Sequence, residues 1–249
     1  MTRDSLTNHQ LDHYRNKGYV TVPGFFTEAE VRTVEDYLVA NQGVKAADKS
    51  HDPLREAHYH HRGIYGVCTL PRLLDVVEQI LGPDIVLLYS HILSKPAGGM
   101  GVAWHQDGPY WPRIEPKVAV TAYMAIDDAN PENGCLRVIP GSHAGCVDYG
   151  QKLTDKPDLI QDHAVALPEG IVDENKSEDV LLKRGDLSLH HSYIIHGSEP
   201  NCSYRRRAAF TIRYVPATTR IQPREDRKQY LVRGQAAGNG NPYFQFGLG

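Results

Sequence analysis

Apolar residues in the N-terminal third of the chain recur with the roughly 3.6-residue spacing of helices. The pattern predicts helices over 11–18, from 27 to about 41, and over 71–81. The second of them opens with Thr27-Glu28-Ala29-Glu30, a capping box in which the threonine and the second glutamate can satisfy backbone N–H groups reciprocally. Residues 42–62 are polar and irregular, which predicts a loop over the core.

From about residue 85 the pattern changes to short apolar runs separated by turn residues such as Asn133-Gly134. The run 118–126 is almost uniformly apolar, which is typical of a central strand. Helices followed by many strands favour an α+β fold, or a barrel supported by helices. The predicted strands are 19–22, 85–93, 118–126, 135–139, 180–182, 186–189 and 208–215.

No repeat and no linker divides the chain, so we expect a single domain over residues 1–249. Its expected parts are a helical N-terminal support over 1–82, a β core over 83–216 and a C-terminal tail over 217–249. The end of the tail, from 234 onward, is rich in glycine, which predicts disorder or, as the alternative, a flap that covers a pocket.

Composition limits the possible binding partners and the cellular compartment of the protein. The 249 residues carry 27 Lys and Arg against 30 Asp and Glu, and 41% of them are hydrophobic, as in an ordinary globular domain. A formal charge of −3 favours neither nucleic acid nor an anionic membrane as partner, and no apolar run is long enough for a membrane span. The N-terminus lacks a signal-peptide pattern and the four cysteines form no C-x-x-C pair, so we expect a cytoplasmic protein with reduced, mostly buried thiols.

The clearest chemistry lies in His105-Gln106-Asp107 and in His196, about ninety residues later. A histidine and a carboxylate two positions apart on an extended strand point to the same face, and a second histidine can join them from a distant strand. Two imidazoles and one carboxylate on one face of an octahedron leave positions open, which suits Fe(II) that must also bind a keto-acid and O2. Taken alone, His105 is equally typical of a buried core histidine, and Asp107 is equally typical of a turn cap. Together with His196 they favour a metal site.

A basic run, Arg205-Arg206-Arg207, follows this second histidine, and its last residue enters a predicted strand. An inward-facing guanidinium at Arg207 can hold the distal carboxylate of a keto-acid with two hydrogen bonds, and the hydroxyl of Ser198 can add another. Arg206 competes for this role, because a shift of one residue in register exchanges the inward and outward faces of a strand. A basic triplet on a solvated surface is the alternative.

Two further groups of residues keep more than one interpretation. Arg55, Arg62, Lys95 and Arg213 are either exposed or in contact with an anionic substrate. The histidines of His58-Tyr59-His60-His61 predict a solvated loop or a pocket wall rather than a metal site, because no acidic residue accompanies them at ligand spacing.

These motifs, together with the segment from Asn133 to His143, resemble the phytanoyl-CoA dioxygenase family of non-haem Fe(II)/2-oxoglutarate oxygenases. The likeness extends to Cys68-Thr69-Leu70-Pro71, Gly82-Pro83-Asp84-Ile85 and Lys95-Pro96, and so covers most of the chain. It implies a mainly β fold with flanking α-helices and a double-stranded β-helix (jelly-roll, cupin-like) core. It also implies Fe(II) as metal, 2-oxoglutarate as co-substrate and O2 as oxidant.

The resemblance assigns residues as well. The implied iron ligands are His105, Asp107 and His196. The implied residues around 2-oxoglutarate are Arg207, Ser198, Tyr123, His91 and Gln106. Tyr123 stands where the family commonly has a tryptophan, and His91 and Gln106 have packing behind the site as an equal alternative.

The implied reaction is hydroxylation of an unactivated C–H bond of a small-molecule metabolite, with release of succinate and CO2. The carboxylate at Asp107 favours hydroxylation over halogenation, because halogenases of the superfamily have a small residue there. The alternatives are desaturation or cyclisation by the same chemistry, a cupin-like metal enzyme that uses no keto-acid, and a binding protein with a degenerate site. We expect no catalytic side chain beyond the metal ligands, and a free metabolite rather than an acyl-CoA as substrate; the oligomeric state stays open.

Overall fold

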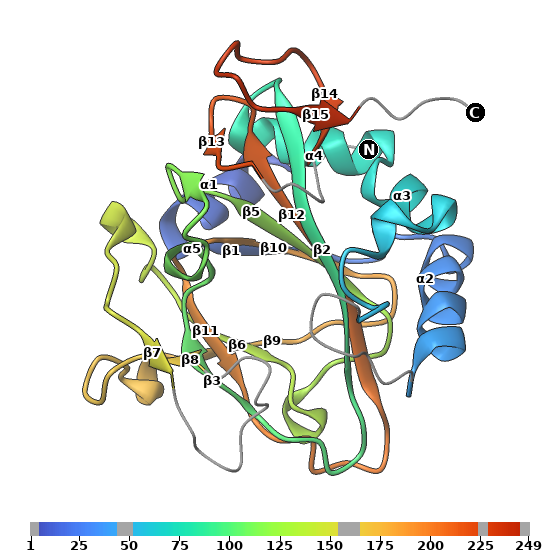
Figure 1. The fold of residues 1–249 in the computed structure, drawn as a ribbon. Coiled ribbons are helices and arrows are strands. Elements are labelled where there is room, and N and C mark those ends of the chain that lie inside the picture. The colour runs from blue at the N-terminus through green and yellow to red at the C-terminus, as the bar shows by residue number, and fades with distance from the viewer. Residues whose placement is uncertain (1–4, 44–51, 154–164, 224–228, 245–249) are drawn as a thin grey trace.

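Two β-sheets face each other across the interior of the protein (Figure 1). The computed structural model describes residues 5–43, 52–153, 165–223 and 229–244. The larger sheet has the strand order β1 (Tyr19–Val22), β10 (Leu187–His191), β5 (Val120–Ala125), β12 (Arg207–Pro216), β2 (Ile85–Lys95), β14 (Gln229–Arg233) and β15 (Tyr243–Phe244). The smaller sheet has the order β3 (Val102–His105), β11 (Ile195–Ser198), β6 (Leu136–Ile139) and β9 (Glu178–Val180).

The pairing of these strands is that of a double-stranded β-helix. Every neighbouring pair in the two sheets is antiparallel except β14 and β15 at the edge. Several consecutive strands, such as β2 and β3, β5 and β6, and β10 and β11, lie in different sheets, so the chain winds back and forth between the sheets. The predicted fold class is confirmed.

The central strand β12 shows how the sequence divides the interior. Side chains alternate between the two faces of a strand, and the alternation in β12 is strict. Residues that pack into the apolar core shared with the helices are Ala208, Phe210, Ile212 and Tyr214. Residues that face the cavity between the sheets are Arg207, Thr211 and Arg213. One strand therefore supplies both the centre of the core and a polar wall of the cavity.

Four helices pack their apolar residues against the larger sheet: α1 (Asn8–Lys17), α2 (Glu28–Asn41), α3 (Arg62–Cys68) and α4 (Pro71–Leu81). The predicted capping box of α2 is present, with Thr27 and Glu30 bonded to each other's backbone. Thr7 forms a second capping box, which starts α1 earlier than the predicted residue 11. Gly18 ends α1 in the left-handed region at φ 83°, a conformation that glycine adopts without a steric penalty.

The sequence pattern misses α3. The described residues of the predicted loop 42–62 contain the short 3-10 helix η2 (Ala57–Tyr59), and α3 follows at its end. Its cap is the imidazole of His61, whose Nδ1 accepts from the backbone N–H of Ile64 at 3.2 Å. A seven-residue helix is marginal in isolation, and its buried residues Ile64, Val67 and Cys68 show that packing stabilises it.

The predicted strands are present with shifted ends. The largest shift is at the predicted strand 180–182, because Val180 pairs with Leu136 at the end of β9 while Leu182 forms an isolated bridge with Ala129. The remaining short elements are α5 (Asp107–Tyr110), η3 (Pro131–Asn133), η4 (Ala144–Cys146), η6 (Glu174–Lys176), β4 (Ile114–Glu115), β7 (Lys152–Leu153), β8 (Val165–Ala166) and β13 (Arg220–Ile221).

The described residues of the tail, 217–223 and 229–244, are part of the fold. Residues 229–233 and 243–244 extend the edge of the larger sheet, and Asn241 fixes the turn between them by donating to the carbonyl of Thr219 at 2.6 Å. None of residues 234–244 lines the cavity between the sheets. Residues 245–249, the end of the glycine-rich segment, lie outside the described residues.

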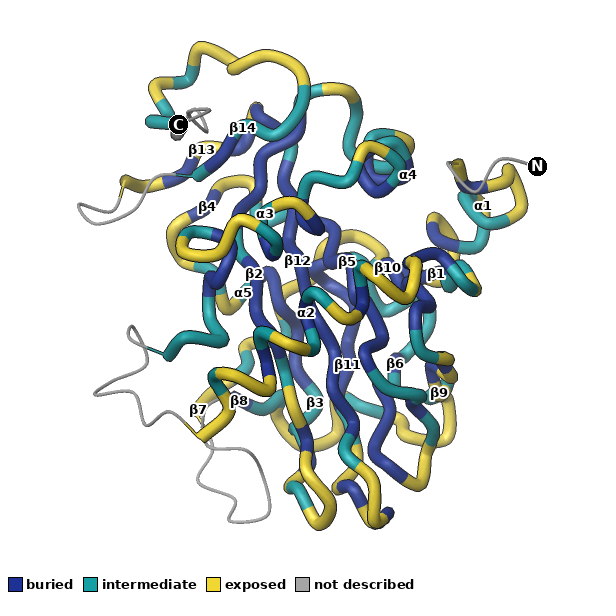
Figure 2. Tube along the Cα trace, turned by 90° about the vertical axis from the view of Figure 1, so that its right-hand side faces the viewer, coloured by how far each residue is buried: buried dark blue, intermediate teal, exposed yellow. Residues whose placement is uncertain are grey.

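Burial follows the sheets: Figure 2 shows β2, β5 and β12 mostly in dark blue and the loops at the lower end in yellow. Two cysteines, Cys68 and Cys135, are buried, whereas Cys146 and Cys202 are exposed. The expectation that most of the thiols are buried is therefore wrong. Over the described ranges, no helix combines the length and the apolar character that a membrane crossing requires.

Candidate metal centre and co-substrate pocket

His105 and His196 lie directly opposite each other on the antiparallel strands β3 and β11. Their ring centroids are 4.1 Å apart, and each Nε2 is 3.9 Å from Oδ1 of Asp107. All three side chains are buried, and their ligand atoms lie within 4.8 Å of one another. The structure therefore brings together the three residues that the sequence pattern singled out.

The local backbone differs from the expected extended strand. β3 ends at His105, and Asp107 is the first residue of the short helix α5. The backbone N–H of Gly108 donates to the carbonyl of Ser192 at 2.7 Å, which ties this turn to the loop before β11. A built Cβ at Gly108 would stand 2.8 Å from the carbonyl oxygen of Lys117, so the close approach requires glycine.

The hydrogen bonds of both imidazoles fix the tautomer that a metal needs. Nδ1 of His105 donates to the carbonyl of Ala103 at 2.8 Å, and Nδ1 of His196 donates to the carbonyl of Ile194 at 3.0 Å. A carbonyl only accepts, so the proton resides on Nδ1 and the lone pair on Nε2. Both lone pairs are then available beside the carboxylate of Asp107.

The protonation states at neutral pH suit metal binding. Burial lowers the pKa of His105 and of His196 to about 4, so both rings are neutral. Burial alone would raise the pKa of Asp107, but the positive charge of Arg213 and the adjacent imidazoles outweigh it and hold that pKa well below its usual range. Two neutral imidazoles and one carboxylate are a donor set that fits Fe(II) and leaves coordination positions free for other ligands.

A second polar cluster lies across the same cavity. Arg207 donates from Nε to the carbonyl of Gly134 and from a terminal nitrogen to the hydroxyl of Tyr123, both at 3.1 Å. These two bonds fix the guanidinium while part of it faces the cavity. Gly134 is held at φ 70°, and a built Cβ there would stand 2.3 Å from the carbonyl of Glu199, so the turn before β6 depends on glycine.

Arg206 has the opposite orientation. Its guanidinium binds both carboxylate oxygens of Asp127, at 2.8 and 2.9 Å, and Glu35 on α2 at 2.6 Å. These partners lie on the helix side of the larger sheet, away from the cavity. Of the two candidate arginines, the structure places only Arg207 at the pocket.

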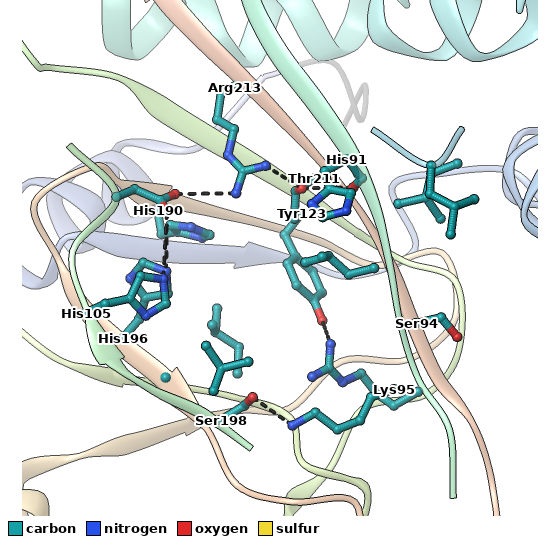
Figure 3. A pocket seen from close by; sticks show the side chains of 18 of the residues that line it. His91, Ser94, Lys95, His105, Tyr123, His190, His196, Ser198, Thr211 and Arg213 are labelled. Atoms are coloured by element: carbon teal, nitrogen blue, oxygen red, sulfur yellow. Dashed lines mark hydrogen bonds and ion pairs between the residues drawn. The ribbon is translucent and has the colours of Figure 1, made fainter. Parts of the chain in front are cut away.

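Lys95 is a cavity residue that the sequence did not distinguish from an exposed lysine. It pairs with Arg207 across β2 and β12 and is only 2% exposed. Its Nζ donates to Oγ of Ser198 at 2.8 Å (Figure 3). It also donates to the carbonyl of Glu199. Burial, together with the charge of Arg207, lowers the pKa of Lys95 to about 7. Lys95 is buried because it pairs with Arg207 across the two strands, and this pairing can be known only from the register of β2 with β12.

The other predicted co-substrate residues divide into two groups. His91 and Tyr123 line the cavity (Figure 3). Gln106 does not: its Nε2 donates to the carbonyls of Tyr193 and Val147, at 2.8 and 3.0 Å, and it is fully buried. Because Gln106 lies between two inward-facing ligands, its side chain points the other way and fastens loops behind the site.

The structure also distinguishes between the two interpretations of the basic residues and of the histidine segment. Arg55 and Arg213 line the cavity, whereas Arg62 is exposed on α3. His58 is buried and hydrogen-bonds Ser90 Oγ at 2.6 Å, so the histidine segment around it is a core and loop element. Among the described residues, His105, Asp107 and His196 form the one group of side chains that could hold a metal ion.

A double-stranded β-helix with two histidines and one aspartate at one end of its cavity is the architecture of the non-haem Fe(II)/2-oxoglutarate oxygenases. The chain belongs to the phytanoyl-CoA dioxygenase family: the family model described as Phytanoyl-CoA dioxygenase (PhyH) matches residues 14–209. The resemblance noted from the motifs is confirmed, and the protein is an Fe(II)- and 2-oxoglutarate-dependent oxygenase of small molecules.

Individual relatives agree with this assignment. The chain is 28% identical to a 2-aminoethylphosphonate dioxygenase of Uncultured bacterium HF130_AEPn_1, covering 91% of this chain and 86% of the relative. It is 30% identical to a methylphosphonate hydroxylase of Gimesia maris, covering 84% and 81%. Among solved structures, the apo form of ThoJ, a non-heme monooxygenase, superposes with a TM-score of 0.77 at 26% identity, covering 94% of this chain and 87% of that one.

Proposed function

We propose that His105, Asp107 and His196 hold Fe(II), that Arg207 with Lys95 and Ser198 holds the distal carboxylate of 2-oxoglutarate, and that the loaded enzyme hydroxylates a C–H bond of a small metabolite. The observation that carries the proposal is the placement of the two clusters in one cavity. The metal ligands lie at one end and the cationic cluster lies across from them, as an elongated dicarboxylate between a metal and an arginine requires.

Bound Fe(II) supplies the activation of O2 that couples oxidation of 2-oxoglutarate to succinate and CO2 with hydroxylation of the substrate. The protein contributes binding and orientation. Arg207 is held by Tyr123 and Gly134 before any ligand arrives, so little side-chain entropy is lost when it receives a carboxylate. Lys95, whose pKa is about 7, gains a proton readily when a negative charge enters beside it.

The cavity supports a small substrate. Its volume is ≈ 240 Å³, and the co-substrate takes part of that space. An adjoining recess of ≈ 290 Å³ shares Arg55, His91, Asp107 and Arg213 with it. The relatives include enzymes named for 2-aminoethylphosphonate and methylphosphonate as well as phytanoyl-CoA dioxygenases, and the small volume of the cavity favours a free metabolite. The exposed thiols of Cys146 and Cys202 favour a reducing compartment, and we propose the cytoplasm.

The test is an assay of coupled turnover. Purified protein is given Fe(II), ascorbate and 2-oxoglutarate under air, and succinate is quantified with and without a panel of small metabolites. We expect Fe(II)-dependent succinate formation that increases with the correct metabolite, together with a product heavier by one oxygen atom. The same protein loaded with Zn(II) is the control. Absence of both Fe(II) binding and 2-oxoglutarate consumption contradicts the proposal.

A further inference from the structure

Arg213 is a buried cation that the co-substrate cluster does not use. It lies on the cavity face of β12, six residues beyond Arg207, and borders both the cavity and the adjoining recess. One terminal nitrogen donates to Thr211 Oγ1 at 2.7 Å, and the other is 3.7 Å from Asp107 Oδ2 (Figure 3). Its guanidinium is thus next to the metal centre, at the end of the cavity away from Lys95.

Aromatic rings hold this guanidinium in place. Its central carbon lies 5.5 Å from the ring centroid of Tyr89 and 6.0 Å from that of Trp111, both within cation–π range. The Nε of Arg213 is buried and has no hydrogen-bond partner among the described residues. A guanidinium carries five N–H donors, so this group is oriented by its neighbours and retains unused hydrogen-bonding capacity.

The charges of the loaded site leave Arg213 without a counterion, an argument that rests on the proposed function. The two positive charges of bound Fe(II) are balanced by Asp107 and one carboxylate of 2-oxoglutarate, and the other carboxylate faces two cations, Arg207 and Lys95, so no negative charge is left for Arg213. Asp107 is the one carboxylate within 4.0 Å of Arg213 over the described ranges. Once its charge is committed to the metal, a buried cation remains, and burying an unpaired charge is costly.

A second arginine adds to the positive potential. Arg55 lines the same cavity and recess, and it donates to the hydroxyl of Tyr89 at 3.1 Å. It is also paired with Asp52 at 3.5 Å, so its charge is partly compensated. The buried Glu56 also lines the recess, so the positive charge that faces the metal from this side is mainly that of Arg213.

We propose that Arg213 binds an oxyanion of the substrate, a carboxylate or a phosphonate, and thereby restricts the enzyme to small anionic metabolites. The guanidinium lies 3.7 Å from a metal-ligand side chain. An anion bound to it keeps the rest of a short molecule at the metal, so the C–H bond that reacts lies a few bonds from the anionic group. Arg213 is a substrate-binding residue in this account, distinct from the co-substrate clamp.

The experiment is a binding cycle on the full chain loaded anaerobically with Fe(II) and 2-oxoglutarate. Calorimetric titrations use two ligands that carry an oxyanion, methylphosphonate and L-proline, and the counterparts in which the oxyanion is masked, dimethyl methylphosphonate and L-prolinamide. Each ligand is titrated into the wild type, Arg213→Gln and Arg213→Lys. Arg32→Gln, the same replacement on the exposed face of α2, is the matched control.

We expect at least one acid to bind the wild type at least tenfold more tightly than the counterpart in which its oxyanion is masked. Arg213→Gln removes this preference, Arg213→Lys retains part of it, and Arg32→Gln keeps it whole. A merely structural role of Arg213 would weaken acid and counterpart equally, so the ratio between them isolates the contact. The proposal is overturned if no acid is preferred by the wild type, or if the preference survives in Arg213→Gln.

The Fe(II)–2-oxoglutarate charge-transfer absorption, recorded before each titration, separates this inference from the proposed function. A wild-type protein that lacks the absorption refutes the proposed function itself. A wild type that shows the absorption and prefers no acid refutes only the role of Arg213. Arg213→Gln could lose the metal because Asp107 is disturbed. In that case Arg213→Lys, which keeps the positive charge beside Asp107, decides whether the preference for the acids depends on Arg213.

Discussion

Replacement of Arg207 by glutamine separates a 2-oxoglutarate enzyme from a metal enzyme that uses no keto-acid. The wild-type side chain offers a carboxylate two charge-assisted hydrogen bonds, each worth about 1.5–3 kcal/mol. Glutamine retains one neutral donor, and Lys95 stays in place beside it. The net loss is therefore about 2–4 kcal/mol, which corresponds to roughly 30- to 1000-fold weaker binding.

The assay is an anaerobic titration of the Fe(II)-loaded protein with 2-oxoglutarate, followed by charge-transfer absorption. Arg206→Gln is the matched control, because it removes the same charge one residue away, on the other face of the strand. Its ion pairs with Asp127 and Glu35 stabilise the fold, so we expect a loss of about 1–3 kcal/mol in the free energy of unfolding and unchanged 2-oxoglutarate affinity. An Arg207→Gln dissociation constant within threefold of the wild type would refute the reasoning.

Three further predictions concern the metal centre, pH and the core. Asp107→Ala removes the one anionic ligand of the triad, so hydroxylation should stop and Fe(II) affinity should fall at least tenfold in equilibrium dialysis; normal turnover would exclude Asp107 as a ligand. Burial lowers the pKa of four histidines to about 4, below the unfolded value near 6.5; they are His105, His190, His191 and His196. The free energy of unfolding of the metal-free protein is therefore highest above pH 6.5 and decreases as the pH falls toward 4. The decrease is up to about 1.4 kcal/mol per pH unit for each histidine. Urea unfolding at pH 7.5 and 5 measures this loss, and equal stabilities would contradict it. Phe210→Ala empties a fully buried position in the middle of β12 and should cost about 3–5 kcal/mol in the same urea assay, whereas a cost under 1 kcal/mol would show that the core does not depend on this ring.

The local parts of the fold were predictable from the sequence. Thr27 and Glu30 announce α2 because a capping box needs only residues three apart, and the uniformly apolar run around Tyr123 predicts a central strand. The short helix α3 was not predictable, because its burial of Ile64 and Val67 depends on tertiary contacts that no local pattern records.

The site divides in the same way. The metal triad is visible because its residue types are rare in combination and two of its members are close in sequence. The choice between Arg206 and Arg207 required the register of β12 with β2, and the same register explains why Lys95 is buried. For Gln106 the sequence left the pocket and packing behind it as equal alternatives, and the structure favours packing because both of its neighbours face the cavity and adjacent residues of an extended segment face opposite ways.

The most direct test of the account is a crystal structure of the protein grown anaerobically with Fe(II) and 2-oxoglutarate, with anomalous data collected at the iron absorption edge. We predict one strong anomalous peak at bonding distance from Nε2 of His105, Nε2 of His196 and a carboxylate oxygen of Asp107, with the distal carboxylate of 2-oxoglutarate on Arg207. Iron bound elsewhere, for example at the histidines of residues 58–61, with the triad empty, would contradict the account.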